Sequence, residues 1–226
     1  MTDECGDGLK LVRLPEAGFP DEHVLNHLRK NFYADEPLNR AVGLCNRGEA
    51  HAELDRHCAS TLAHNCSCII VDQKQSKIAG AALNGIVRKG DREECERRLA
   101  ELKDSKFRSI FGLLYSIDEK VDLFERYNVD ELFECRILSV QETYRGRGLA
   151  NVLVENSIRI AQQAGFKVMK ADATGIFSQK VFRKYGFDVV TEIPYSEVDE
   201  NLRPGPPHEA LKLMVKVLDQ DASRTE

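Results

Sequence analysis

The chain has 226 residues, 42% of them hydrophobic, and a formal net charge of −5 at pH 7. This length suits one α/β domain with a core of its own. The acidic balance differs from the clustered positive charge of nucleic-acid-binding proteins, so we expect no nucleic-acid partner, whereas cationic substrates are compatible with it.

No apolar run is long enough to span a bilayer, and the first eight residues, MTDECGDG, are too acidic for a signal peptide. The seven cysteines are odd in number and lack paired CxxC spacing, so they indicate neither a disulfide framework nor a zinc site. We therefore expect a soluble, cytoplasmic protein with no membrane partner and no metal, present as a monomer or a weak dimer.

The chain begins with a strand and a helix. Residues 9–14 alternate weakly between apolar and polar and predict the strand. Acidic residues directly after Pro20 mark a helix start, and an apolar stripe continues to Phe32. Pro37 is predicted to end this helix, because the residue before a proline is pushed out of the α region.

Glu36 is the residue before that proline, so it is predicted to lie just beyond a helix C-terminus. There the negative end of the helix dipole would disfavour the ionised carboxylate and raise its pKa towards that of a usable base. A solvated loop carboxylate is the plainer interpretation, and position alone favours it.

The next part of the chain predicts three helices and a hairpin, with the hairpin at residues 68–87 and the helices at 47–63, 92–102 and 107–124. Within the hairpin, Gly80 and Gly85 mark a bulge or a close contact. The last helix keeps apolar residues at helical spacing over about five turns and is predicted to face the core.

A strand over residues 131–140 leads into a glycine-rich turn and then an apolar-faced helix that reaches Ala164. The two glycines of the turn lie where the backbone approaches something closely or takes a positive φ. A helix start offers unpaired N–H groups and the positive end of the dipole, so it can hold a phosphate or pyrophosphate. Arg145 and Arg147 add positive charge. A tightly packed structural turn remains the alternative, since the spacing fits neither a dinucleotide fingerprint nor a P-loop.

The remaining residues predict a strand, a helix, two strands and a disordered tail, at 167–173, 176–185, 187–193, 209–218 and 219–226. The order of elements is mixed α/β, with a mostly antiparallel first half and one βαβ unit at the glycine turn. No repeat or linker divides the chain, so residues 1–218 are predicted to form one domain.

The glycine turn resembles the acetyl-coenzyme A signature of the GNAT acetyltransferase superfamily, with Arg145, Gly148 and Ala150 in its defining places. Three further segments, at residues 32–39, 82–85 and 137–146, resemble one branch, the insect arylalkylamine N-acetyltransferases, and the likeness covers about residues 9–217. This resemblance implies a single-domain α/β fold with a twisted, mixed, mostly antiparallel sheet flanked by helices. Its two central strands would splay apart around the pantetheine arm of the coenzyme.

The resemblance implies acetyl-coenzyme A (acetyl-CoA) as co-substrate and a small primary amine as the other partner. It maps the general base onto Glu36 and so overturns the plainer interpretation of that residue. The carboxylate would take a proton from the ammonium form of the amine, which attacks the thioester directly in a ternary complex. Backbone donors of the strand end would polarise the thioester carbonyl. We expect the coenzyme to contact Leu138, Ser139, Val140, Arg145, Gly146, Arg147, Gly148, Leu149 and Ala150.

The donor of a proton to the leaving thiolate is a further point of the resemblance. Many GNAT enzymes carry a tyrosine at the place of Phe182, which has no proton to give. Ser178 lies one helical turn earlier on the same face, and the arylalkylamine branch is similar there and at the place of Thr174. We assign Ser178 as the acid or thiol partner, with a water relay as the alternative, and Thr174 as a substrate-side hydroxyl. Tyr185 is the fallback donor.

The function implied is acetyl transfer to small arylalkylamines such as dopamine, serotonin, octopamine or tryptamine. Two alternatives stay open. One is the same chemistry on aliphatic polyamines or agmatine, since related insect enzymes differ in this respect while keeping the same motifs. The other is a module that binds acyl-CoA without turnover, against which Glu36 and Ser178 both count.

Overall fold

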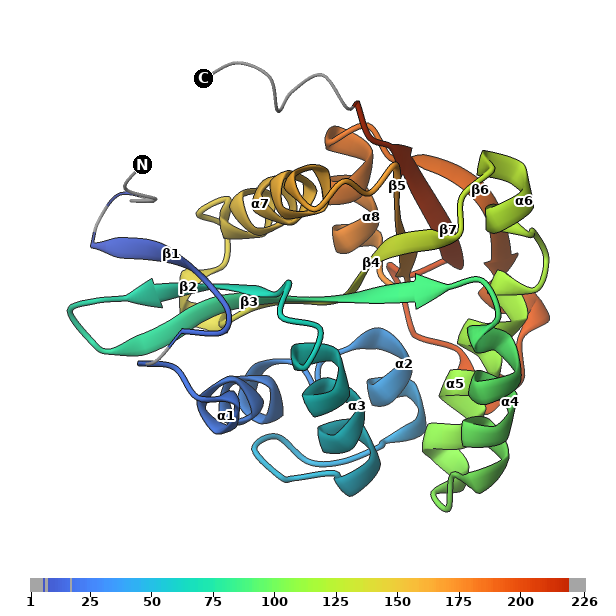
Figure 1. Cartoon of the computed structure of the whole chain (residues 1–226). Helices are drawn as coiled ribbons and strands as arrows, with labels where there is room; N and C mark the ends of the chain where they lie inside the picture. Colours follow the sequence, from blue (N-terminus) through green and yellow to red (C-terminus); the bar gives the residue numbers. More distant parts are fainter. Residues whose placement is uncertain (1–5, 7, 17, 220–226) are drawn as a thin grey trace.

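A mixed β-sheet forms the middle layer of the molecule, and helices cover both of its faces (Figure 1). The computed structural model describes residues 6, 8–16 and 18–219, except the side chain of Arg92. The tail expected from residue 219 therefore lies, apart from Asp219, outside the described residues. No helix within this described part of the chain is long and apolar enough to cross a membrane.

The described residues form a seven-stranded sheet in which every neighbouring pair is antiparallel except β4 and β5. In spatial order the strands are β1 (Leu9–Arg13), β2 (Cys68–Asp72), β3 (Lys77–Arg88), β4 (Glu131–Val140), β5 (Val168–Ala173), β7 (Ala210–Val217) and β6 (Asp188–Pro194). The predicted mixed, mostly antiparallel sheet is confirmed, and every predicted strand is present.

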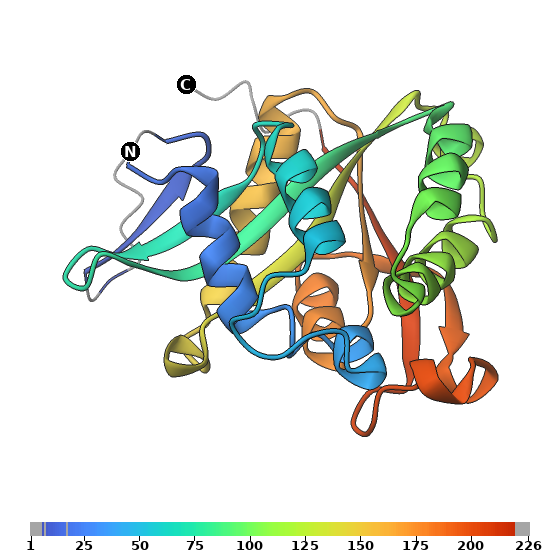
Figure 2. The same ribbon diagram turned by 90° about the horizontal axis from the view of Figure 1, so that it is seen from below.

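The helices divide between the two faces, as Figures 1 and 2 show. One face carries α1 (Asp21–Asn31), α2 (Pro37–Val42), α3 (Ala52–Leu62), α4 (Asp91–Glu101), α5 (Ser105–Asp118) and α6 (Leu123–Tyr127). The other face carries α7 (Leu149–Gln163) and α8 (Ile176–Lys184). Three short 3-10 turns, η1 (Glu142–Tyr144), η2 (Tyr195–Glu197) and η3 (Glu200–Leu202), complete the order.

Each face has its own apolar core. Val24 and Leu28 of α1 are fully buried against the α1–α6 face, and Leu153 and Val154 of α7 are fully buried against the other. Burying a side chain of this size contributes roughly 1.5–3 kcal/mol. The predicted apolar stripes of these two helices therefore do fix them to opposite sides of one sheet.

The two central strands part after a short ladder. In the described chain β4 and β5 pair at Phe133 with Met169 and at Glu134 with Lys170, and they diverge beyond these pairs. The register of β3 with β4 also shifts, leaving Arg136 as an extra, bulged residue. A Cβ at Gly85 would lie 2.5 Å from the Arg136 guanidinium, so the predicted close contact at this glycine is confirmed. The splayed strands implied by the family resemblance are present.

Three helix predictions need correction. The single helix expected over residues 107–124 is two, because α5 ends at Asp118 and Asp122 caps the start of α6 by accepting from the Glu125 N–H. The helix expected from residue 47 begins only after His51, whose Nδ1 accepts from the Leu54 N–H. The prediction that Pro37 ends the first helix is also wrong, because α1 already ends at Asn31. Pro37 instead begins the short, unpredicted helix α2, since proline fits the first position of a helix.

Candidate active site

A cavity of about 2070 Å³ extends from the α1–α6 face into the gap between β4 and β5 and on to the start of α7. Small-molecule sites usually measure about 300–1,000 Å³, so this cavity has room for two ligands. All predicted site residues except Arg147 line it: Glu36, Thr174, Ser178, Leu138, Ser139, Val140, Arg145, Gly146, Gly148, Leu149 and Ala150.

Glu36 caps the start of α2, where its Oε2 accepts from the Asn39 N–H at 2.7 Å. The prediction that it lies beyond a helix C-terminus is therefore wrong. Glu36 lies at the N-terminus of α2, where the positive end of the helix dipole favours the ionised carboxylate. Its pKa is nevertheless raised, because burial outweighs the hydrogen bond from Asn39 and the influence of the Thr174 side chain. The predicted direction holds for a different physical reason.

The second carboxylate oxygen of Glu36, Oε1, is buried and has no hydrogen-bond partner among the described residues. The Thr174 side chain is near enough to lower the pKa of Glu36, yet it makes no bond of ordinary geometry with Oε1. An unpaired buried acceptor costs about 1–3 kcal/mol. This oxygen can therefore accept a hydrogen bond from a substrate N–H.

The loop after β5 lies against the start of α2. A Cβ at Gly175 would be 3.1 Å from Pro37 Cγ, and the buried Tyr195 hydroxyl donates to the Thr174 carbonyl at 2.7 Å. These contacts hold Thr174 beside Glu36, although the two residues are far apart in the sequence. Tyr195 had no signal in the sequence analysis.

The glycine turn and Glu36 are joined through Asp35. Arg145 pairs with the Asp35 carboxylate at 3.2 Å, and its Nε donates to the Val140 carbonyl at 3.1 Å. The turn thus lies next to the segment that carries Glu36. Arg147 instead lies over the Tyr144 ring at 5.3 Å and does not line the cavity.

The start of α7 fits an anionic group. Gly148 precedes the helix with φ +78°, and no side chain of the described residues caps the first turn. The cavity reaches Gly148, Leu149 and Ala150, so unpaired backbone N–H groups can meet a phosphate there. A diphosphate-bearing chain such as CoA would then pass into the gap between the splayed strands.

The strand end contributes mainly backbone. The Ser139 hydroxyl is within 3.2 Å of His27 Nε2, so this side chain faces α1 rather than the gap. Leu138 and Val140 pack on the α7 side. Their backbone along β4 lies beyond the last pair with β5, so it faces the gap without a strand partner in the described ladder.

Ser178 lies on α8 at the wall of the cavity, and its hydroxyl donates to the Gly175 carbonyl at 2.9 Å. Phe182 is buried against Phe187, with ring centroids 5.0 Å apart. The Tyr185 hydroxyl points to Glu155 of α7, and Tyr185 does not line the cavity. The fallback donor is therefore misplaced for the leaving thiolate.

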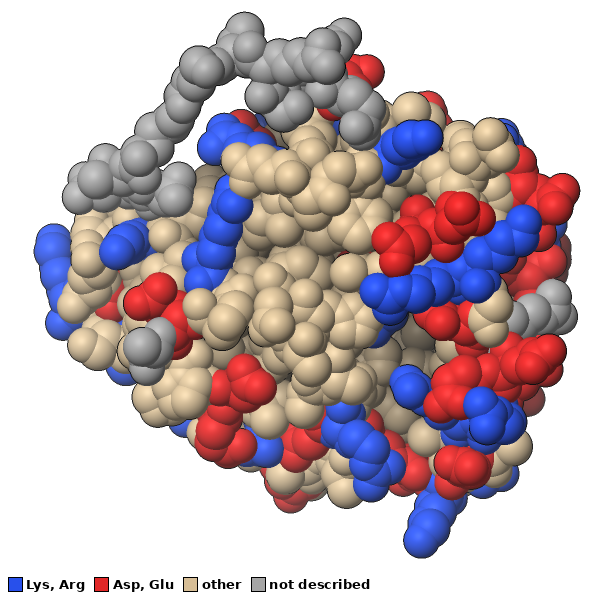
Figure 3. Space-filling model, in the orientation of Figure 1, with Lys and Arg blue, Asp and Glu red and all other residues tan. Residues whose placement is uncertain are grey.

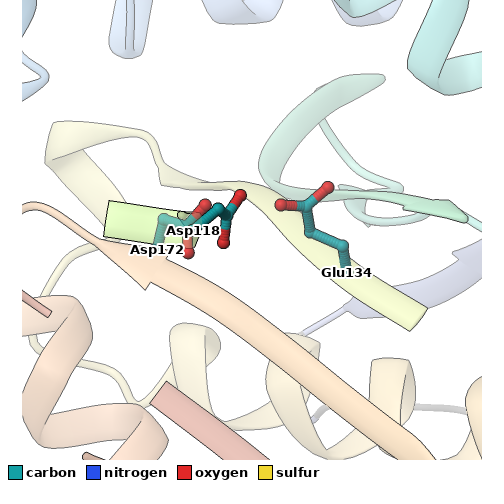
Figure 4. Close-up of side chains that lie close together, drawn as sticks. All are labelled: Asp118, Glu134 and Asp172. Carbon is teal, nitrogen blue, oxygen red and sulfur yellow. The ribbon is translucent and has the colours of Figure 1, made fainter. Parts of the chain in front are cut away.

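A buried ionic cluster on the α5 side of the cavity was missed by sequence reasoning. Lys170 lies among the carboxylates of Asp118, Glu134 and Asp172, and the three acidic side chains converge (Figure 4). The Lys170 ammonium stands where a metal ion would otherwise be held. The available signal was the pair of charged residues at alternate positions of a central strand, Lys170 and Asp172.

The outer surface carries its charges differently. Acidic and basic side chains are interspersed where α4, α5 and α6 lie, at the right of Figure 3, and the middle of this face is mostly uncharged. The charged cluster around Lys170 is instead internal, in the lining of the cavity.

The comparisons with known proteins agree with this geometry. Residues 30–187 match the acetyltransferase (GNAT) family. The crystal structure of arylalkylamine N-acetyltransferase 2 from Aedes aegypti is 41% identical, covers 94% of this chain and 100% of its own, and superposes with a TM-score of 0.89.

Two more distant structures share the fold. A mosquito arylalkylamine N-acetyltransferase like 5b is 23% identical, with a TM-score of 0.79 and coverage of 93% of this chain and 99% of its own. A Drosophila melanogaster polyamine N-acetyltransferase is 20% identical, with a TM-score of 0.80 and coverage of 93% and 100%. The family match spans well over half of the chain, and the first relative covers nearly all of it. This protein therefore belongs to the GNAT family of acetyltransferases, which use acetyl-CoA.

Proposed function

We propose that the protein transfers an acetyl group from acetyl-CoA to the primary amine of small arylalkylamines such as dopamine, serotonin, octopamine and tryptamine. The 41% identity with an Aedes aegypti arylalkylamine N-acetyltransferase supports this substrate class. The observation that carries the proposal is a shared cavity, which joins the unpaired Glu36 Oε1 to the uncapped start of α7.

Glu36 acts as the general base. An amine is an ammonium ion near neutral pH and cannot attack a carbonyl carbon until it loses a proton. The Glu36 carboxylate lies in the cavity with one free oxygen, and its raised pKa makes it a better proton acceptor than an ordinary glutamate. Thr174, held by Tyr195 and near Glu36, lines the amine side of the same space.

The start of α7 and the free edge of β4 hold the co-substrate, which supplies the activated acyl group. The N–H groups of Gly148, Leu149 and Ala150 bind its diphosphate, and the backbone of Leu138 to Val140 meets its amide-bearing arm. Ser178, or a water beside it, returns a proton to the thiolate, since its hydroxyl lies on the cavity wall.

Direct attack by the amine is supported by the state of the cavity cysteines. Cys95 and Cys135 line the cavity, and burial raises the pKa of both thiols. A thiol held neutral is a weak nucleophile, so neither residue is suited to carry the acetyl group covalently.

Acetylation of aliphatic polyamines or agmatine is the second candidate. Its support is the three carboxyl groups in the cavity, those of Asp118, Glu134 and Asp172, although Lys170 already pairs with all three. Binding of acyl-CoA without turnover has no comparable support, because a binding module would not need a buried carboxylate with an unpaired oxygen.

A steady-state screen with acetyl-CoA tests the proposal by following thiol release. The panel is tryptamine, dopamine, octopamine, histamine, agmatine and spermine. We expect turnover to be fastest with the arylalkylamines. Faster turnover with agmatine or spermine would favour the second candidate, and tight acetyl-CoA binding without turnover on any amine would favour the binding module.

A further inference from the structure

Lys170 is an internal cation in the wall of the cavity. It is 2% exposed, and its ammonium lies 2.5 Å from Asp118, 3.2 Å from Glu134 and 3.0 Å from Asp172. Figure 4 shows these three carboxyl groups, which come from α5, β4 and β5, turned toward one another. A lysine is almost never buried unless it is paired in this way.

The cluster and Glu36 line the same cavity. Lys170, Asp172 and Thr174 alternate along β5 and its continuation, so their side chains share one face of the strand. Two residues of strand span about 7 Å, which separates the Asp172 backbone from the Thr174 backbone. The Lys170 ammonium is level with Asp172, because it lies 3.0 Å from Asp172 Oδ2. Glu36 and Lys170 line the same cavity, so an amine whose nitrogen meets Glu36 can extend its other end toward this ammonium.

The cluster already contains its own cations. Arg136 pairs with Glu134 at 2.7 Å, so the described cluster sets two cations against three carboxyl groups. Burial raises the pKa of Asp172 well above its ordinary value, which allows one carboxyl group to remain protonated. Asp172 Oδ1 is buried and lacks a partner in the described chain. Lys170 thus already fills the place among the carboxyl groups where the second cation of a substrate would bind.

We propose that Lys170 is a specificity-determining residue, which occupies the position that the second cation of a diamine would need and thereby selects amines with an uncharged far end. The inference rests on the proposed function, since it takes Glu36 as the place where the reacting nitrogen binds. It distinguishes the two candidate substrate classes, arylalkylamines and polyamines, through a residue of this chain and does not depend on similarity to other proteins.

The first test uses the unaltered protein and two amines that differ at one end. Hexylamine and cadaverine have the same length, with a methyl group in one where the other has a second ammonium. Placing like charges together is unfavourable, so we expect kcat/KM for hexylamine to exceed that for cadaverine by about 10-fold or more. Equal or higher kcat/KM for cadaverine would overturn the inference.

The second test removes the internal cation. In Lys170→Met the ratio of kcat/KM for cadaverine to that for hexylamine should rise by about 10-fold, because the carboxylates are left to pair with the substrate. Asp118 and Asp172 would lose their ion pairs with Lys170, which can also prevent folding. The double variant Lys170→Met with Asp118→Asn keeps the original balance, with one cation fewer and one carboxylate fewer, and should show the same direction of change.

A matched control is Lys212→Met. Lys212 pairs with Glu192 at 3.1 Å on β7 and does not line the cavity, so its loss should leave the ratio unchanged. If Lys170 had a purely structural role, both Lys170 variants would lose activity on cadaverine and on hexylamine equally, and the ratio would stay unchanged. That result, with tryptamine still acetylated, would overturn the inference. Absence of thiol release with tryptamine would overturn the proposed function itself.

Discussion

Burial shifts the pKa values of two side chains in opposite directions. It raises the pKa of the Glu36 carboxyl and lowers that of His27 to about 4. His27 Nδ1 lies 3.1 Å from the Ile78 carbonyl, which can only accept, so Nδ1 carries the hydrogen and Nε2 accepts from Ser139. The neutral ring thereby links α1 to β3 and β4.

His27 predicts a loss of stability in acid. An unfolded histidine titrates near 6.5, so below that pH the unfolded chain binds a proton that the folded chain refuses. The contribution of His27 is therefore complete above pH 6.5 and falls as the pH approaches 4, by up to about 3 kcal/mol. Urea unfolding at about pH 7 and about pH 5 measures this change.

The matched variant for this measurement is His27→Gln, whose amide can still bond to Ile78 and Ser139 but does not titrate. It should lose less free energy of unfolding between the two pH values than the unaltered protein does. The same loss in both proteins would show that other groups cause the acid sensitivity.

At this scale the sequence predicted the chemistry of Glu36 better than its surroundings. The family resemblance singled out the carboxylate, and a raised pKa was expected, but the cause assigned was a helix dipole of the wrong sign. Burial depends on α2 and on the loop around Gly175, which lies far away in the sequence. The partners of Lys170 escaped prediction for the same reason.

Helix α7 has a left-handed glycine on each side, and these allow a controlled test of the turn. Gly146 lies before the helix with φ +78°, and Gly165 lies after it with φ +82°. A Cβ at either position would meet nothing within 4 Å, so alanine is strained in both by about 1–2 kcal/mol without a clash.

We expect Gly146→Ala and Gly165→Ala to lower thermal stability by similar amounts, because the backbone strain is the same. Only Gly146 lines the cavity, so only Gly146→Ala should also raise KM for acetyl-CoA, by several-fold. Steady-state kinetics and melting curves of both variants provide the comparison. An equal KM for acetyl-CoA in the two variants would mean that the turn does not contact the coenzyme.

Secondary structure could be predicted where a long periodic pattern exists, as in α7 and β4, and failed where capping decides. Asp122 starts a new helix inside a run of apolar residues that keeps helical spacing. Pro37 starts α2, which has only six residues, and so shows no period to detect. Local hydrogen bonds, rather than hydrophobic spacing, fixed these boundaries.

The whole molecule brings together groups that no local pattern connects. One cavity reaches the gap between β4 and β5, the glycine turn and Glu36, and the Asp35–Arg145 pair ties the glycine turn to the Glu36 segment. The sequence predicted the splay through family resemblance alone. It could not predict the cluster at Lys170, because Asp118, Glu134 and Asp172 come from elements separated in the chain.

The pH dependence of kcat/KM for tryptamine tests whether the reacting amine binds at Glu36. In the unaltered protein kcat/KM should rise with pH as the Glu36 carboxyl loses its proton, with a midpoint above the ordinary 4.5. In Glu36→Gln this rise should vanish and kcat/KM should fall by about 100-fold or more, with acetyl-CoA affinity unchanged. An unchanged profile and rate in Glu36→Gln would contradict the account.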